Sequence, residues 1–126
     1  VLKSLNKFYC TDLGVKKIKT NKKEVNYSQA FENIVYNDLV NKGYEIYVGK
    51  TKTGEIDFIA SKNNKIKYIQ ACYDLSYEET RQREFGAFDN ILDNYPKYVI
   101  SKDFEDYSQN GIKHLNIFDF LMNDDF

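Results

Sequence analysis

Asp57 is the residue of this chain whose type and position point most clearly to chemistry. It lies in the run GEIDFIA (54–60), which otherwise has the apolar character of a buried strand. The next strand-like run, IKYIQAC (66–72), carries the polar residue Gln70 among apolar neighbours. Burying an unpaired charge costs several kcal/mol, so an aspartate inside a strand normally has a partner, a metal ion or a catalytic task.

The expected side-chain directions bring Asp57 and Gln70 together. Because side chains alternate along a strand, Gln70 shares a face with Cys72, and Asp57 shares one with Glu55 and Ile59. If the two strands pair with those faces coinciding, Asp57 and Gln70 lie side by side.

Glu32 is the third candidate, because it lies in a helix-like segment from which it can approach the same cluster. Hard divalent ions such as Mg²⁺ and Mn²⁺ prefer oxygen ligands, and two carboxylates with one amide oxygen suffice for a weak site. A metal-bound water and a stabilised leaving phosphate would then support phosphodiester hydrolysis. We therefore expect Glu32, Asp57 and Gln70 to be both the catalytic residues and the ligands of a weakly bound Mg²⁺ or Mn²⁺.

Each candidate also has a purely structural interpretation. Asp57 could face solvent at a sheet edge or pair with a lysine, and Glu32 could be the polar flank of an amphipathic helix. Gln70 could form hydrogen bonds inside the core, and Cys72 is typical of a small buried hydrophobic residue. The single histidine, His114, is expected at the surface or at a strand edge.

The elements around these residues predict an α/β domain with a central mixed sheet flanked by helices. Apolar residues recur at helical spacing over 28–42, and Gly43 ends that helix. The remaining pattern predicts strands over 44–50, 53–60, 65–73, 97–101 and 114–118. It also predicts a helix from 77 to about 93 and a helical turn over 119–122. Near the start of the chain it predicts a short strand over 8–10 and a turn or helix over 13–18.

Composition indicates one globular domain of 126 residues, with 42% apolar residues and a net charge of -1. The charge is uneven, because residues 1–23 contain seven lysines and one acidic residue. This basic segment could contact phosphate or an acidic partner, or it could be a solvated surface.

Two cysteines, Cys10 and Cys72, predict reduced thiols in a cytoplasmic protein, and no apolar run is long enough to predict a membrane span. The chain begins without Met, which suggests a piece of a longer protein.

Across nearly its whole length the chain resembles a known family. It is similar to the carboxy-terminal PD-(D/E)xK-nuclease-like domain, a domain of unknown function, found on bacterial and archaeal P-loop ATPases of the AAA class. The stretches that carry the resemblance are KFYCTDLG (7–14), FENIVYNDL (31–39), GYEIYVG (43–49), GEIDFIA (54–60), YIQACY (68–73), ETRQREFGAFDNILDNYPKYVIS (79–101) and GIKHLNIFDFL (111–121).

The resemblance implies a restriction-endonuclease-like core over residues 1–126, with 1–25 as a basic segment leading into it. It also implies an ATPase core upstream as a partner in the same polypeptide, and DNA as a further possible partner. No Gly-x-x-x-x-Gly-Lys-Ser/Thr motif is present, so the chain itself is not expected to bind ATP. In the family pattern, Glu32 matches the helix acid, Asp57 the motif aspartate, Gln70 the (D/E) position and Cys72 the lysine position.

Two departures from that pattern weaken the expected chemistry. Gln70 is neutral, and Cys72 cannot supply the ammonium group that orients water and steadies the phosphate. Loss of one such group typically costs about 10²–10³ in rate, so the leading hypothesis is a catalytically degenerate accessory domain that acts in protein or DNA interaction. The alternative is a metal-dependent DNA endonuclease with a rearranged site, in which Lys50, Lys52 or Lys97 replaces the missing lysine. A third possibility is a purely structural lid or oligomerisation domain.

Overall fold

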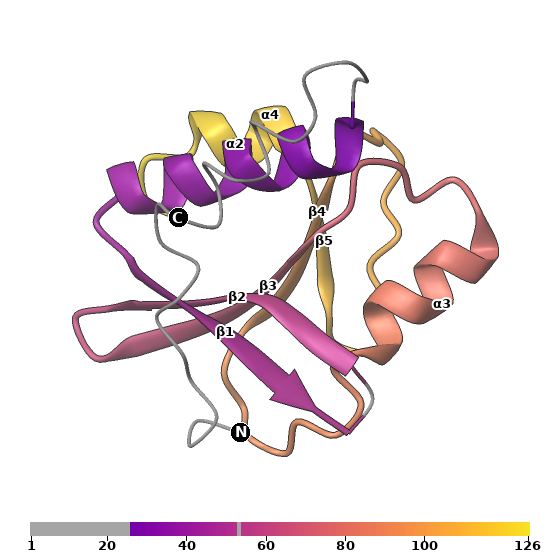
Figure 1. The fold of residues 1–126 in the computed structure, drawn as a ribbon, viewed down its shortest axis with the longest axis horizontal. Coiled ribbons are helices and arrows are strands. Elements are labelled where there is room, and N and C mark those ends of the chain that lie inside the picture. The colour runs from indigo at the N-terminus through magenta and orange to yellow at the C-terminus, as the bar shows by residue number, and fades with distance from the viewer. Residues whose placement is uncertain (1–25, 53) are drawn as a thin grey trace.

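A computed structural model describes residues 26–52 and 54–126, so the strand expected over 8–10, the helix or turn over 13–18 and the basic segment lie outside the described residues. Within them the elements run in the order α2 (Tyr27–Asn41), β1 (Glu45–Thr51), β2 (Gly54–Lys62), β3 (Lys65–Ala71), α3 (Glu78–Gly86), β4 (Lys97–Ser101), β5 (Lys113–Asn116) and α4 (Ile117–Met122). Figure 1 shows their arrangement as helices packed on a twisted sheet.

The described strands form one mixed sheet in the order β1-β2-β3-β4-β5. The pairs β1–β2 and β2–β3 are antiparallel, whereas β3–β4 and β4–β5 are parallel. The β2–β3 hairpin turns at Asn63 and Asn64, both of which have positive φ. A two-residue hairpin turn requires positive φ, and asparagine is one of the residues that tolerate it. The expectation of an α/β fold with a central mixed sheet is therefore confirmed.

Two hydrophobic cores lie on the two faces of the sheet. Helices α2 and α4 cover one face, where their apolar residues pack against Phe58, Ile69 and Ile100. Helix α3 and the segment after it cover the other face, where they pack against Ile59 and Val99. Figure 1 shows α2 and α4 side by side and α3 on the opposite side of the sheet. The sheet is therefore buried on both faces, and functional groups must reach solvent at its ends.

Helix α2 forms where the sequence predicts it. The Asn26 side chain accepts a hydrogen bond from the backbone N–H of Gln29 (3.1 Å), which caps the first turn. Phe31, Val35 and Leu39 are buried, as their helical spacing predicts. Ile34, which belongs to the same expected stripe, is instead 46% exposed, so the buried stripe is narrower than the sequence suggests.

Two predicted boundaries are wrong. The helix expected to reach about residue 93 ends at Gly86, because glycine is a weak helix former. The chain then continues as turns, in which the backbone N–H of Phe88 donates to the carbonyl oxygen of Phe85 and that of Asp89 donates to the carbonyl oxygen of Gly86. The strand expected over 114–118 ends at Asn116. The side chain of Asn116 accepts a hydrogen bond from the backbone N–H of Phe118 (2.8 Å) and starts α4 there.

Candidate functional site

A β-bulge in β2 places Asp57 at the candidate site. Tyr47 of β1 pairs with Ile59 and Gly49 pairs with Ile56, so two residues of β2, Asp57 and Phe58, lie opposite a single residue of β1. Strict alternation would put Asp57 and Ile59 on one face and Ile56 on the other. Ile56 and Ile59 instead both pack in the core beneath α3, so the expected sharing of one face by Glu55, Asp57 and Ile59 is wrong. Bulges commonly redirect a side chain beside a functional site.

The backbone pairing of β2 with β3 ends next to Asp57, and side chains continue it. The last paired residues are Phe58 and Ile69. Beyond them, the backbone N–H of Asp57 donates to Oε1 of Gln70 (2.7 Å), and Nε2 of Gln70 donates to the carbonyl oxygen of Glu55 (3.3 Å). The backbone N–H of Ala71 donates to Oδ2 of Asp57 (2.9 Å). The expectation that Asp57 and Gln70 lie side by side is therefore confirmed.

Asp57 titrates far from its ordinary range. Its pKa is raised to about 8, chiefly by burial and also by the charges of Glu32, Glu84 and Glu55, while the hydrogen bond from Ala71 opposes the shift. Desolvation and like charges both disfavour an ionised carboxylate. Asp57 is therefore largely protonated at neutral pH while no cation lies beside it.

Glu84 of α3 is a site residue that the sequence did not reveal. Its side chain is only 15% exposed, and burial together with the nearby charge of Glu32 raises its pKa, while the neighbouring Arg83 opposes this. Arg83 Nε lies 3.4 Å from a Glu84 oxygen, and Arg83 is the exposed partner of this ion pair. The neighbouring Gln82 and Arg83 are exposed, so no pattern within the helix sequence marks Glu84 as facing inward.

Three carboxylates from three elements therefore influence one another: Glu32 from α2, Asp57 from β2 and Glu84 from α3. Such a gathering repels itself, and a divalent cation or protons would relieve it. No three His, Cys, Asp or Glu residues within 26–52 and 54–126 are arranged so that they could hold a metal ion. The metal site at Glu32, Asp57 and Gln70 therefore stays a prediction.

Cys72 supplies no positive charge at the position matched to a lysine. Burial raises the pKa of its thiol to about 12, and the charge of Glu84 adds to the shift. The thiol is therefore neutral at physiological pH, and its Sγ donates to the carbonyl oxygen of Asp74 (3.5 Å). A neutral thiol in this environment is neither a substitute for an ammonium group nor an activated nucleophile.

Lys97, one of the lysines considered as a replacement, is engaged elsewhere. Its Nζ donates to the backbone carbonyl oxygens of Asp93 and Tyr95 (3.0 Å each). Arg81 is also engaged, because its guanidinium donates to the carbonyl oxygen of Leu75 (2.8 Å) and lies over the ring of Tyr107. Both side chains support the chain segments around α3.

His114 is buried, with 7% of its surface exposed, so the prediction of a surface position is wrong; it does lie in β5, an edge strand of the described sheet. Its Nδ1 accepts from the backbone N–H of Tyr107 (3.2 Å), which leaves Nε2–H to donate to Oγ of Ser101 (2.7 Å). Ser101 in turn donates to Oδ2 of Asp103 (2.9 Å). In a hydrolase triad the histidine lies between the acid and the nucleophilic serine. Here the order is different, because the fully buried Ser101 lies between Asp103 and His114. The network ties the loop after β4 to β5.

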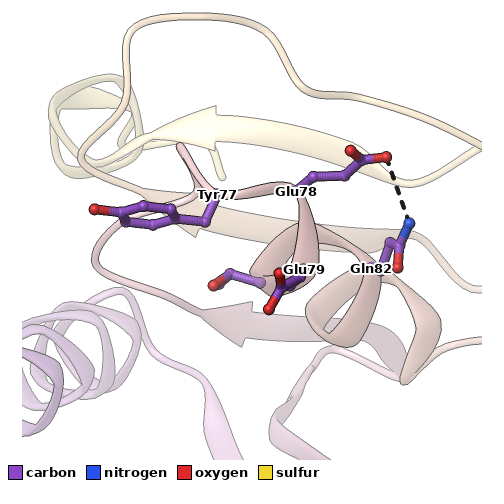
Figure 2. A pocket seen from close by; sticks show the side chains of 5 residues that line it. Tyr77, Glu78, Glu79 and Gln82 are labelled. Atoms are coloured by element: carbon purple, nitrogen blue, oxygen red, sulfur yellow. Dashed lines mark hydrogen bonds between the residues drawn. The ribbon is translucent and has the colours of Figure 1, made fainter.

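A second surface feature is a pocket at the start of α3, lined by Tyr77, Glu78, Glu79, Thr80 and Gln82. Figure 2 shows Glu78 reaching toward Gln82, to which it is hydrogen bonded (3.5 Å). The two glutamates make this pocket acidic, and none of the five lining residues is cationic. It therefore offers no charge complementarity to a phosphate group.

Among the described helices, none combines the length and the apolar character needed to cross a membrane.

Comparison with known proteins finds a relative of similar sequence but no characterised function. The chain is 36% identical over 125 residues to an uncharacterized protein of Haemophilus influenzae, and the match covers 96% of this chain. The matched region is 30% of the relative's length, so the chain spans about a third of that protein. No protein-family profile matches the chain. No solved structure matches it either.

Proposed function

We propose that this chain is an accessory domain of nuclease-like fold within a larger ATPase, and that its catalytic site is degenerate. In this proposal the domain acts through contacts with protein or DNA rather than through hydrolysis. The observation that carries the proposal is the role of the Gln70 side chain. Its amide oxygen accepts from the backbone N–H of Asp57, and its amide nitrogen donates to the carbonyl oxygen of Glu55. A side chain used in this way holds two strands together, and it adds no charge to the site.

The charge state of the neighbouring residues supports the same proposal. With its pKa near 8, Asp57 carries little negative charge at neutral pH to attract a cation. Cys72 is a neutral thiol where the family pattern has a lysine. The site therefore lacks both the full anionic pull for Mg²⁺ or Mn²⁺ and the cationic group that would stabilise a phosphate in the transition state.

A second candidate function is a Mg²⁺- or Mn²⁺-dependent DNA endonuclease with a rearranged site. The observation that favours it is Glu84, a carboxylate on α3 that interacts with Glu32 and Asp57. Glu84 would add negative charge near Asp57 although Gln70 is neutral, and Gln70 would assist as a neutral oxygen ligand. Because the described carboxylates are not arranged as a set of three ligands, they would have to move closer together to share a cation. The cation would supply a bound water of lowered pKa and would polarise the phosphate.

Calorimetric titration with Mn²⁺ at pH 7 separates these two functions. For the degenerate domain we expect no saturable binding below millimolar concentration, and no difference between the wild type and Asp57→Asn. Saturable micromolar binding that is lost in both Asp57→Asn and Glu84→Gln would contradict the proposal and favour the endonuclease. Glu79→Gln is the matched control, because Glu79 is an exposed glutamate of the same helix.

A further inference from the structure

Exposed apolar side chains gather at the ends of β4 and β5 where these parallel strands finish. Phe104, 82% exposed, lies in the loop after β4, while Phe118 (59%) and Met122 (83%) lie one turn apart on α4. The rings of Phe104 and Phe118 stack with their centroids 6.3 Å apart and their planes at 17°. We call Phe104, Phe118 and Met122 the aromatic strip. Large apolar side chains that remain in contact with water and with one another typically mark an interaction surface.

One buried residue, Asn116, is hydrogen bonded to both segments that carry the aromatic strip. Nδ2 of Asn116 donates to the backbone carbonyl oxygens of Lys102 (3.0 Å) and Asp103 (3.2 Å), which fixes the chain just before Phe104. Oδ1 of the same residue accepts from the backbone N–H of Phe118 (2.8 Å). Because Asn116 fixes the backbone on both sides of the stacked pair, little ordering remains to be done when a partner binds.

The surroundings of the aromatic strip are acidic. The segments 102–106 and 117–126, which carry the strip, contain six acidic residues and one lysine. That lysine, Lys102, lies 3.8 Å from carboxylate oxygens of both Asp74 and Asp103, so its charge is already paired. An acidic surface repels the phosphates of nucleic acid and attracts lysine and arginine.

We propose that the aromatic strip is the docking surface for another protein, which presents apolar side chains flanked by lysine or arginine. The aromatic rings provide the apolar contact at the centre, and the surrounding carboxylates select for a basic rim. The inference rests on the interaction role in the proposed function, but it is independent of whether the acidic site at Asp57 binds a metal. An unexpected result in the Mn²⁺ titration would therefore not contradict the proposed docking surface.

The test uses the whole chain and three fluorescent probes in an anisotropy titration. The first probe is an amphipathic helical peptide of leucine and lysine, of about 18 residues or five turns. The second is the same peptide with every lysine replaced by glutamate. The third is a single-stranded DNA whose negative charge matches that of the second probe. We expect the leucine–lysine peptide to bind at least about tenfold more tightly than either of the others, equivalent to about 1.4 kcal/mol.

Variants of the strip decide whether the binding is specific. Phe104→Ser and Phe118→Ser alter exposed side chains, so both variants should fold, and each should weaken peptide binding by about tenfold or more. Leu92→Ser is the matched control, because Leu92 is 93% exposed but lies between α3 and β4. The proposal would be overturned if all variants bound the peptide equally or if DNA bound more tightly than the peptide. It would also be overturned if sedimentation showed a dimer that is lost in Phe104→Ser, because the strip would then bind a second copy of the chain.

Discussion

Replacing Asp57 with asparagine should stabilise the folded protein at neutral and alkaline pH. Asparagine retains the shape of aspartate and can still accept the hydrogen bond from Ala71, but it has no charge to desolvate. The pKa of Asp57 in the folded state, about 8, lies well above its value of about 3.9 in an unfolded chain. We expect a gain in the free energy of unfolding on the order of 5 kcal/mol at pH 8, because the pKa differs between the two states by about four units.

The pH dependence gives this prediction its sign. Between about pH 4 and pH 8 the folded wild type binds more protons than the unfolded chain, so the wild type loses stability as the pH rises through this range. Asp57→Asn lacks this loss, so its advantage should be near zero at pH 4 and should grow up to about pH 8. Urea denaturation followed by circular dichroism at several pH values measures the difference.

Glu55→Gln is the control for this series. Glu55 is a neighbouring but exposed carboxylate in the same strand, and its replacement should change stability by no more than about 0.5 kcal/mol. A destabilised Asp57→Asn variant, or a stabilisation that is the same at pH 4 and pH 8, would mean that Asp57 is ionised and well solvated in the fold.

Gln70→Ala should be among the most destabilising single substitutions in the described part of the chain. Gln70 is 4% exposed, and its amide satisfies the backbone N–H of Asp57 and the carbonyl oxygen of Glu55 where the two strands no longer pair directly. Truncation leaves both groups unsatisfied and opens a cavity between β2 and β3. We expect a loss of about 2–4 kcal/mol in the free energy of unfolding.

Two further variants separate the contributions to this loss. Gln70→Met fills nearly the same volume without the hydrogen bonds and should lose about 1–3 kcal/mol. Gln82→Ala removes an exposed glutamine from α3 and should cost no more than about 0.5 kcal/mol. If Gln70→Ala were as stable as Gln82→Ala, the amide of Gln70 would be free to coordinate a ligand, and its structural role would be refuted.

The parts of the fold with a regular pattern could be predicted from the sequence. The apolar spacing of Phe31, Val35 and Leu39 defines α2, and the Asn63–Asn64 pair defines the β2–β3 turn. These signals are local, because each depends on residues within one or two turns of the chain. The pairing of Asp57 with Gln70 followed from the same hairpin.

The parts that were missed depend on contacts between distant segments. The bulge at Asp57 and Phe58 requires the register of β1 against β2, which no pattern within β2 reveals. Glu84 reads as a member of a charged helix surface until α3 is placed against the sheet. His114 reads as a surface residue because its partners, Ser101 and Tyr107, belong to another strand and a loop.

The most direct test of the degenerate site is plasmid cleavage in the presence of Mn²⁺ by the wild type and by the double variant Gln70→Glu with Cys72→Lys. The double change restores a carboxylate and an ammonium group at the two altered positions. We predict no cleavage by the wild type above the level of Asp57→Asn, and Mn²⁺-dependent nicking by the double variant. Cleavage by the wild type that disappears in Asp57→Asn would contradict a degenerate site and would establish the domain as a working endonuclease.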